Sequence, residues 1–179
     1  MPAPLDTSKS ALYIAGTNRS DDLFMYYKGQ VRVGPRTTYS ISFEVQIATH
    51  VPSGCGGVGG APGEDVTVKA GASTAEPEAT VAGGFLRMNV DKGQQSQGGA
   101  NALVLGDVAN SRRCEEPLQW ELKRLAAGSL PVTTDDSGRL WLFVGTDSGF
   151  ESRTAIYYTR VTARLERLTS GSAVGVVAP

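Results

Sequence analysis

The segment GCGGVG at residues 54–59 has the G-x-G-x-x-G spacing of a dinucleotide-binding turn. That chemistry requires a strand directly before the glycines and a helix directly after them, so that the pyrophosphate meets the helix N-terminus. Here the segment HVPS intervenes on one side, and VTVK, a strand pattern, follows on the other. The sequence therefore predicts a long glycine loop and no nucleotide cofactor. A loop whose backbone approaches some other ligand is the alternative.

Acidic residues in three loop-like segments could bind a metal ion. Calcium takes six to eight oxygen ligands from carboxylates, amides and carbonyls, and converging sandwich loops can supply them. The spacing of an EF-hand is absent. These acids are either turn formers and solvated charges or ligands of a Ca²⁺ site, and the candidate ligands are Asp21, Asp22, Asp91 and Asp147.

Two predicted strands have a polar face each, formed by residues 40, 42, 44 and 46 and by residues 160, 162, 164 and 166. Such faces either contact water or, on a concave sheet, bind a sugar, with aromatic rings stacking on its apolar faces. The candidate ligand-binding residues are Tyr26, Tyr27, Glu44, Gln46, Phe150 and Arg160. Trp120 and Trp141 lie among leucines and are assigned to the core.

Nucleophilic catalysis would have to use His50, the single histidine, as its base, and a lone histidine at a strand end is usually structural. Two-carboxylate glycoside hydrolysis needs only two suitably spaced acids, and the 18 acidic residues leave it open. No catalytic residue is predicted.

Cys55 and Cys114 belong to no C-x-x-C pair and have no neighbouring histidine, which argues against zinc. Both lie in polar or glycine-rich surroundings, which favours a disulfide over two free thiols in a cytosolic protein. A disulfide predicts an extracytoplasmic location. The first six residues, MPAPLD, lack the basic and apolar regions of a signal peptide, so no signal sequence is predicted within the residues given.

The elements that would position these residues are strands. Residues 37–47 alternate apolar and polar side chains, and residues 23–33, with a possible bulge at Gly29, predict an antiparallel partner across the Gly34-Pro35 turn. Residues 118–122 fit a strand or a helix, of which we favour the strand. Residues 135–138 form a turn before a central strand. The other predicted strands are residues 11–15, 66–70, 85–90, 102–105, 140–144 and 154–165.

The composition fits one all-β domain. The 179 residues include 22 glycines and 9 prolines, and their 17 basic and 18 acidic side chains give a formal charge of -1. This balance argues against nucleic acid as a partner, and no apolar run is long enough for a membrane span. We predict a β-sandwich of jelly-roll type with long glycine-rich loops over residues 1–168, followed by a tail at residues 169–179.

Two segments resemble carbohydrate-binding jelly rolls of the galactose-binding-like type: VRVGPRTTYSISF (31–43), and IYYTRVTARL (156–165), which resembles their closing strand. Such modules often have an aspartate where this chain has Thr159 or Arg160, so no calcium or sugar contact is inferred there from the resemblance. Four blocks resemble a family of uncharacterised bacterial exported proteins, some with lipoprotein-type signals: NRSDDLFMYYKGQV, PSGCGGVGGAPGEDVTVKAGAS, MNVDKGQQSQGGANALVLGD and LWLFVGTDSGFESRTAIYYTRV. That family implies no established activity.

We therefore expect a non-catalytic extracytoplasmic binding module of unknown oligomeric state. Glycan is the leading ligand class, and calcium is a candidate cofactor. The alternatives are a carboxylate-dependent hydrolase that acts on a glycan and a purely structural assembly domain.

Overall fold

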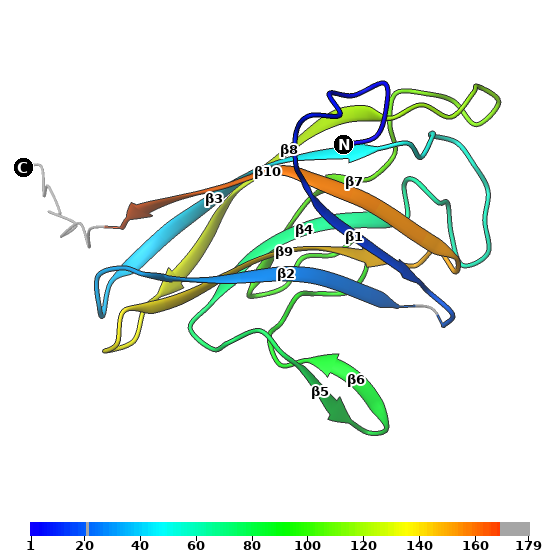
Figure 1. Ribbon diagram of the computed structural model, residues 1–179. Coiled ribbons are helices and arrows are strands. Elements are labelled where there is room, and N and C mark those ends of the chain that lie inside the picture. The colour runs from blue at the N-terminus through cyan, green and yellow to red at the C-terminus, as the bar shows by residue number, and fades with distance from the viewer. Residues whose placement is uncertain (21, 169–179) are drawn as a thin grey trace, which may run out of the picture.

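Ten strands form two four-stranded antiparallel sheets and a separate hairpin in the computed structural model, which describes residues 1–20 and 22–168 (Figure 1). The predicted tail at residues 169–179 lies outside the described residues. Sheet A has the order β1 (Leu12–Thr17), β10 (Arg153–Arg167), β3 (Thr38–Thr49), β8 (Glu121–Thr133). Sheet B has the order β2 (Leu23–Arg32), β9 (Arg139–Ser148), β4 (Val66–Ser73), β7 (Ala102–Asp107). The hairpin consists of β5 (Ala79–Ala82) and β6 (Phe85–Met88).

The connectivity is that of a jelly roll. When the hairpin is set aside, β1 pairs with β10, β2 with β9, β3 with β8 and β4 with β7. The first half of the chain therefore runs antiparallel to the second, and most successive strands lie in opposite sheets. The predicted fold class is confirmed.

The main core lies between the two sheets, and strand β3 shows how the sequence forms it. Its side chains alternate between half-buried or exposed polar residues and buried apolar ones, as predicted. The buried positions are Tyr39, Ile41, Phe43, Val45 and Ile47. Each such side chain contributes about 1.5 to 3 kcal/mol through its removal from water.

The predicted pairing of residues 23–33 with residues 37–47 is wrong, because β2 and β3 lie in opposite sheets. The turn between them takes the chain across the sandwich: Arg36 has a φ of 47°, and the Gly34 amide donates to the Tyr39 hydroxyl at 2.9 Å. The bulge expected at Gly29 is also wrong, since the β2–β9 register is continuous there. The Gly34-Pro35 turn signal does not show whether the strand after it pairs with the strand before it or crosses to the opposite sheet.

Other boundaries also differ from the prediction. Strand β8 begins at Glu121, where the predicted strand was ending, and continues to Thr133. Trp120 and Trp141 are half-buried and belong to neither buried core cluster, so their assignment to the core is wrong. Trp141 lies on the outer face of sheet B, with the Lys28 ammonium 5.5 Å from its ring centroid.

The segment between β4 and β7, residues 74–101, folds over the outer face of sheet B, and we call it the cover segment. A second apolar cluster lies beneath it, formed by buried Val90, Ala102 and Phe143 with Phe24, Tyr26 and Met88 at its margin. Strand β4 is consequently buried along its whole length. On sheet A, by contrast, outward side chains such as Glu44, Arg160 and Arg164 remain exposed.

The predicted disulfide is confirmed. Cys55 and Cys114 are bonded at a sequence separation of 59, and they join the glycine loop to the segment before β8. The amide of Ser53 also donates to the Arg112 carbonyl at 2.7 Å. The two loops therefore form one crosslinked end of the sandwich. In the part of the chain that the structure describes, no helix has the length and apolar character required of a membrane span.

Replacement of both cysteines by alanine should lower the free energy of unfolding by about 4 kcal/mol, because the crosslink reduces the entropy of the unfolded chain over a long loop. Urea unfolding of the oxidised wild type and the double variant measures the difference. The reduced wild type should match the variant, and a loss below about 1 kcal/mol would contradict the expectation.

Candidate functional site

The outer face of sheet A brings together the two polar faces predicted from sequence. Strand β3 lies between β10 and β8, and the register places their outward side chains side by side. Three successive rows cross these strands: Arg160, Gln46 and Arg124; then Thr162, Glu44 and Ala126; then Arg164 and Ser42 with Gly128 beside them.

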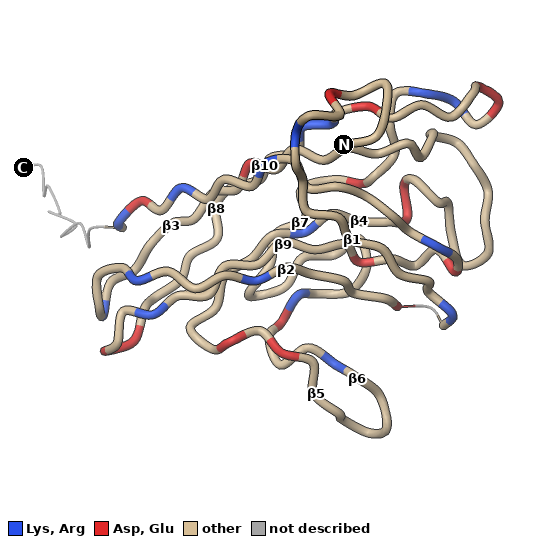
Figure 2. The backbone as a smooth tube through the Cα atoms, viewed as in Figure 1, with Lys and Arg blue, Asp and Glu red and all other residues tan. Residues whose placement is uncertain are grey.

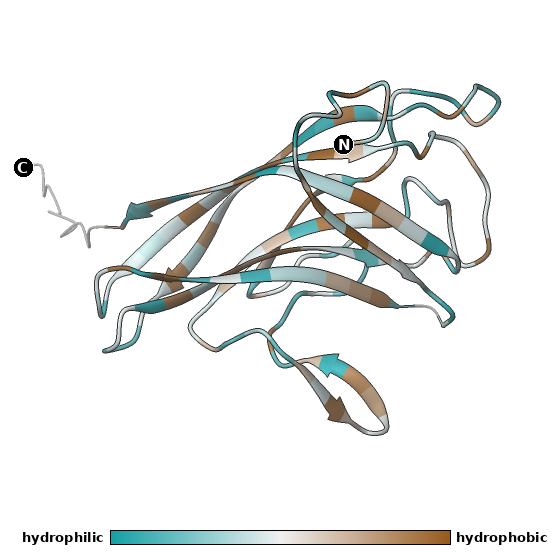
Figure 3. Cartoon of the chain, in the orientation of Figure 1, coloured by the Kyte–Doolittle hydropathy of each residue, from teal (hydrophilic) through white to brown (hydrophobic). Residues whose placement is uncertain are grey.

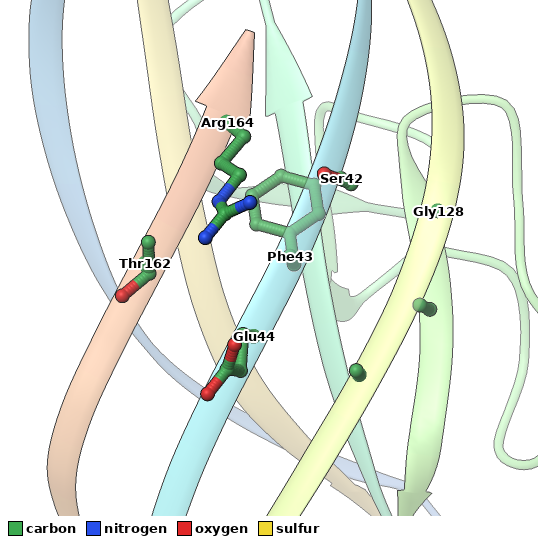
Figure 4. Close-up of a pocket in the computed structure, with 8 residues that line it drawn as sticks. Ser42, Phe43, Glu44, Gly128, Thr162 and Arg164 are labelled. Atoms are coloured by element: carbon green, nitrogen blue, oxygen red, sulfur yellow. The ribbon is translucent and has the colours of Figure 1, made fainter.

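The second and third rows line an open trough of about 400 Å³, which we call the sheet A trough (Figure 4). Its lining residues are Ser42, Phe43, Glu44, Ala126, Ala127, Gly128, Thr162 and Arg164. The trough exists because its β8 side has almost no side chain. A Cβ at Gly128 would lie 2.9 Å from the Ser42 Cβ, so a larger residue there would occupy the trough. Polar groups of β3 and β10 line the opposite side.

Three arginines on this face have no carboxylate partner within the described chain. No ion pair joins Arg124, Arg160 or Arg164 to an acidic residue of residues 1–20 or 22–168. All three side chains are exposed. Their guanidinium donors are therefore available to a ligand.

An aromatic row adjoins the Arg160 row. Tyr13 lies 4.7 Å from Tyr157 between ring centroids, Tyr157 lies 5.3 Å from Trp120, and Trp120 lies 4.2 Å from His50. Tyr13 is 44% exposed, and the other three rings are half-buried. Sequence reasoning missed this row. The alternation in β10, with Tyr158 buried, was the signal that its neighbour Tyr157 is directed outward.

His50 has a structural position in this row. Burial lowers the pKa of its imidazole, and no hydrogen-bond partner in the described chain contacts its Nδ1. A general base in a triad needs a third group to orient it. The tilted ring contact with Trp120 gives His50 a structural role instead.

The six predicted ligand-binding residues are divided between two faces and a loop. Glu44, Gln46 and Arg160 lie together on sheet A. Tyr27 is directed toward the core, where its ring meets Tyr158 edge-on. Tyr26 donates to the Pro77 carbonyl at 3.2 Å on the outer face of sheet B. The structure therefore assembles half of the predicted set.

Phe150 packs against the glycine loop and the margin of the main core. A Cβ at Gly57 would lie 2.5 Å from the Phe150 ring, and the Glu151 amide donates to the Val58 carbonyl at 2.8 Å. The glycines allow the loop to approach this turn closely, and strand β4 follows the loop, as the sequence indicated.

Two of the four predicted calcium ligands lie in a charge cluster at the cover segment, in which Asp147 is fully buried and Asp22 is at the exposed margin. The ammonium of Lys69, a fully buried side chain, donates to Asp147 Oδ2 at 2.6 Å and to the carbonyls of Lys92 and Gln97 at 3.0 and 2.8 Å. Lys92 Nζ lies 2.8 Å from the same Asp147 oxygen and 3.5 Å from Asp22. Burial lowers the pKa of Lys69, and Asp147 opposes this change. Three acceptors around one nitrogen require the charged form, which alone has three donors.

Asp91 caps the next turn of the cover segment. Its carboxylate accepts hydrogen bonds from the amides of Gly93 at 3.0 Å and Ala100 at 2.8 Å, and these bonds lower its pKa. Asp21 lies outside the described residues. Among the residues described, no group of three or more acidic, histidine or cysteine side chains could hold a metal ion. The calcium site stays a prediction.

Comparison with known proteins adds no family assignment: no family model matches the chain, and no significant match is found among curated proteins.

Replacement of Lys69 by methionine should lower the free energy of unfolding by about 3 to 5 kcal/mol, because it removes one partner of a buried ion pair and leaves two carbonyls unsatisfied. Urea unfolding gives the loss, and hydrogen exchange should show faster opening of residues 91–101. Lys123→Met, at a half-buried pair with Asp107, is the matched control and should cost about 1 kcal/mol or less. Equal losses of unfolding free energy in the two variants would contradict the greater importance of the buried Lys69 pair.

Asp22 should make stability depend on pH. Burial and the adjacent Asp147 raise its pKa from 3.8 to about 6, against the opposing effect of Lys92. The folded state then binds this proton more tightly than the unfolded chain. The stabilisation from protonated Asp22 is therefore fully present below about pH 4 and is lost as pH rises through 6. The free energy of unfolding of Asp22→Asn, relative to that of the wild type, should rise by about 1 kcal/mol between pH 4 and pH 7. This value allows for a side chain that is 42% exposed.

Unfolding in urea at pH 4, 5, 6 and 7 measures this gain. Asp91→Asn is the control, since the pKa of Asp91 is lowered and its contribution changes only at lower pH. A difference between Asp22→Asn and wild type that stays constant over this range would contradict the raised pKa.

Proposed function

We propose that the protein is a non-catalytic glycan-binding module and that the sheet A trough, with the aromatic row beside it, is its binding site. The observation that carries the proposal is an open, polar-sided trough on the same exposed sheet face as a row of aromatic rings, with the Arg160 row between them. A sugar ring presents apolar C–H faces that stack on aromatic rings, and hydroxyls that require hydrogen-bond partners. Both kinds of group occur on this face.

The polar groups near the trough are suited to hydroxyls and to an acidic substituent. Thr162 and Ser42 can donate or accept, Glu44 accepts, and Gln46 does both. Thr159 holds the Gln46 side chain through a 2.9 Å hydrogen bond to its Oε1. Arg124, Arg160 and Arg164 have no ion-pair partner among the described residues, and they favour glycans that have carboxylate or sulfate groups, because arginine binds such anions bidentately.

The spacing of carboxylates on this face supports binding without hydrolysis. Glu44 pairs with Thr162, and Glu166 pairs with Ser40, four residues further along β3. At about 3.4 Å per residue, these two backbone positions are offset by about 14 Å along the adjacent strands. Glycosidases hold their two carboxyl groups roughly 5 to 9.5 Å apart. The arrangement favours a binding module over the hydrolase alternative.

An extracytoplasmic location is part of the proposal. The Cys55–Cys114 bond is typical of an oxidising compartment. Glycans on cell surfaces and in the surrounding medium would be accessible to a protein in that location.

Replacement of Ala126 by tryptophan should lower glycan affinity at least tenfold, because the new ring would occupy the trough from an exposed position on β8. A glycan array that includes neutral, uronic-acid and sulfated oligosaccharides identifies the ligand, and calorimetry measures the affinities. Thr133→Trp, on the same strand and face but outside the trough, is the matched control and should bind like wild type.

Three results would contradict the proposal: no binding by the wild type to any glycan class, equal loss in the two tryptophan variants, or release of shortened oligosaccharides during incubation. Preference for neutral over acidic glycans would contradict the role given to the three arginines and leave the site itself intact.

A further inference from the structure

The β5–β6 hairpin exposes an unusual amount of apolar surface. Val81 is 76% exposed, Phe85 67% and Leu86 74%. Gly83 and Gly84, both with positive φ, form the turn and have no heavy atom within 4 Å of a Cβ built on them. Figure 1 shows the hairpin extending away from the sandwich, and Figure 3 shows its tip as apolar.

Both faces of the hairpin are apolar. In the register, Val81 pairs with Leu86 and Ala82 with Phe85, so each face of this short ladder presents one apolar pair. No charged residue occurs from residue 79 to residue 86, and the first charge after the turn is Arg87 (Figure 2). A protein groove that binds a hairpin commonly contacts one face. This tip requires apolar surroundings on both faces.

The base of the hairpin, in contrast, is fixed to sheet B. Tyr26 and Lys28 both donate to the Pro77 carbonyl, at 3.2 and 2.9 Å. Asn89 Nδ2 donates to the Glu76 carbonyl at 2.8 Å, and the Glu78 amide donates to Asn89 Oδ1 at 2.9 Å. These bonds hold the base of the hairpin in place on the outer side of sheet B.

We propose that this hairpin tip docks the protein on a lipid bilayer by inserting Val81, Phe85 and Leu86 among the headgroups and upper acyl chains. A bilayer surrounds an inserted tip on every side, as the two apolar faces require. An interface with a second copy or another protein would need roughly 1,200 Å² of buried surface, more than paired strands of four residues supply.

The charges at the hairpin base indicate the type of lipid. The Arg87 guanidinium lies 5.9 Å from the Phe85 ring centroid, a position suited to lipid phosphate at the depth of the headgroups. Lys28 is paired with Glu76 at 2.7 Å, and Glu78 adds a second carboxylate nearby. The base has no excess of positive charge, so docking should use apolar insertion and not depend on anionic lipid.

Docking in this orientation leaves the proposed glycan site accessible. The hairpin belongs to the cover segment on the outer face of sheet B, whereas the trough lies on the outer face of sheet A (Figure 1). The two surfaces are on opposite sides of the sandwich. The membrane proposal nevertheless stands without the glycan proposal, because it uses none of the same residues.

Sedimentation with phosphatidylcholine vesicles tests the proposal. The wild type should bind, and the double variant Phe85→Ser/Leu86→Ser should show at least a tenfold lower partition coefficient. Val58→Ser, a 69% exposed valine of the glycine loop, is the matched control and should partition within twofold of wild type. All three proteins should unfold at the same temperature, since the replaced tip side chains are largely exposed.

Insertion depth provides a second measurement. Leu86→Trp should show a blue-shifted emission with vesicles and quenching by brominated lipid, relative to the wild type with its two native tryptophans. Absence of wild-type binding would overturn the proposal, as would equal binding by the double variant or binding that requires anionic lipid and disappears with salt. A concentration-dependent dimer that the double variant loses, without any vesicle binding, would assign the tip to a second copy instead.

Discussion

The buried ion pair between Lys69 and Asp147 fastens the cover segment to sheet B, the sheet whose outer face that segment covers. Lys69 lies in the middle of β4, where an ammonium group would ordinarily contact water. Its three acceptors are one carboxylate on β9 and two carbonyls of the cover segment. Because a buried ammonium is tolerated only when its donors are paired, the cover segment that buries Lys69 must also supply two of its three acceptors. The outer sheet face that remains exposed is that of sheet A.

Most of the fold was predictable from local pattern. The alternation in β3 and the apolar run of β9 correctly predicted a half-buried strand and a central strand, and turn residues between short strands predicted a sandwich. Which strands pair with each other could not be predicted from local pattern. The Gly34-Pro35 turn is equally consistent with a hairpin and with a crossing between sheets, and only contacts distant in sequence, such as β2 with β9, distinguish them.

The site was predictable in part for the same reason. The polar positions of β3 and β10 were evident from alternation, and the register places them side by side. The aromatic row was not evident, because Tyr13, Tyr157 and Trp120 come from three distant segments. The acidic residues suggested a calcium site. Asp22 and Asp147 do approach each other, but lysines from β4 and the cover segment supply the positive charge beside them. A sequence shows which residues could attract a cation, but not whether the chain provides the cation itself.

The cover segment determines how the two proposed surfaces, the sheet A trough and the hairpin tip, are placed relative to each other. Its residues 89–101 cover the outer face of sheet B, and its residues 79–88 leave that face as an apolar hairpin. A domain whose two sheets were both open could bind ligand on either face, and its orientation at a membrane would be undefined. Here one insertion closes one face and places an apolar tip beside it, so that the remaining face is directed away from the surface on which the tip would dock. The buried lysine that fixes the insertion therefore also fixes the relation between the two surfaces.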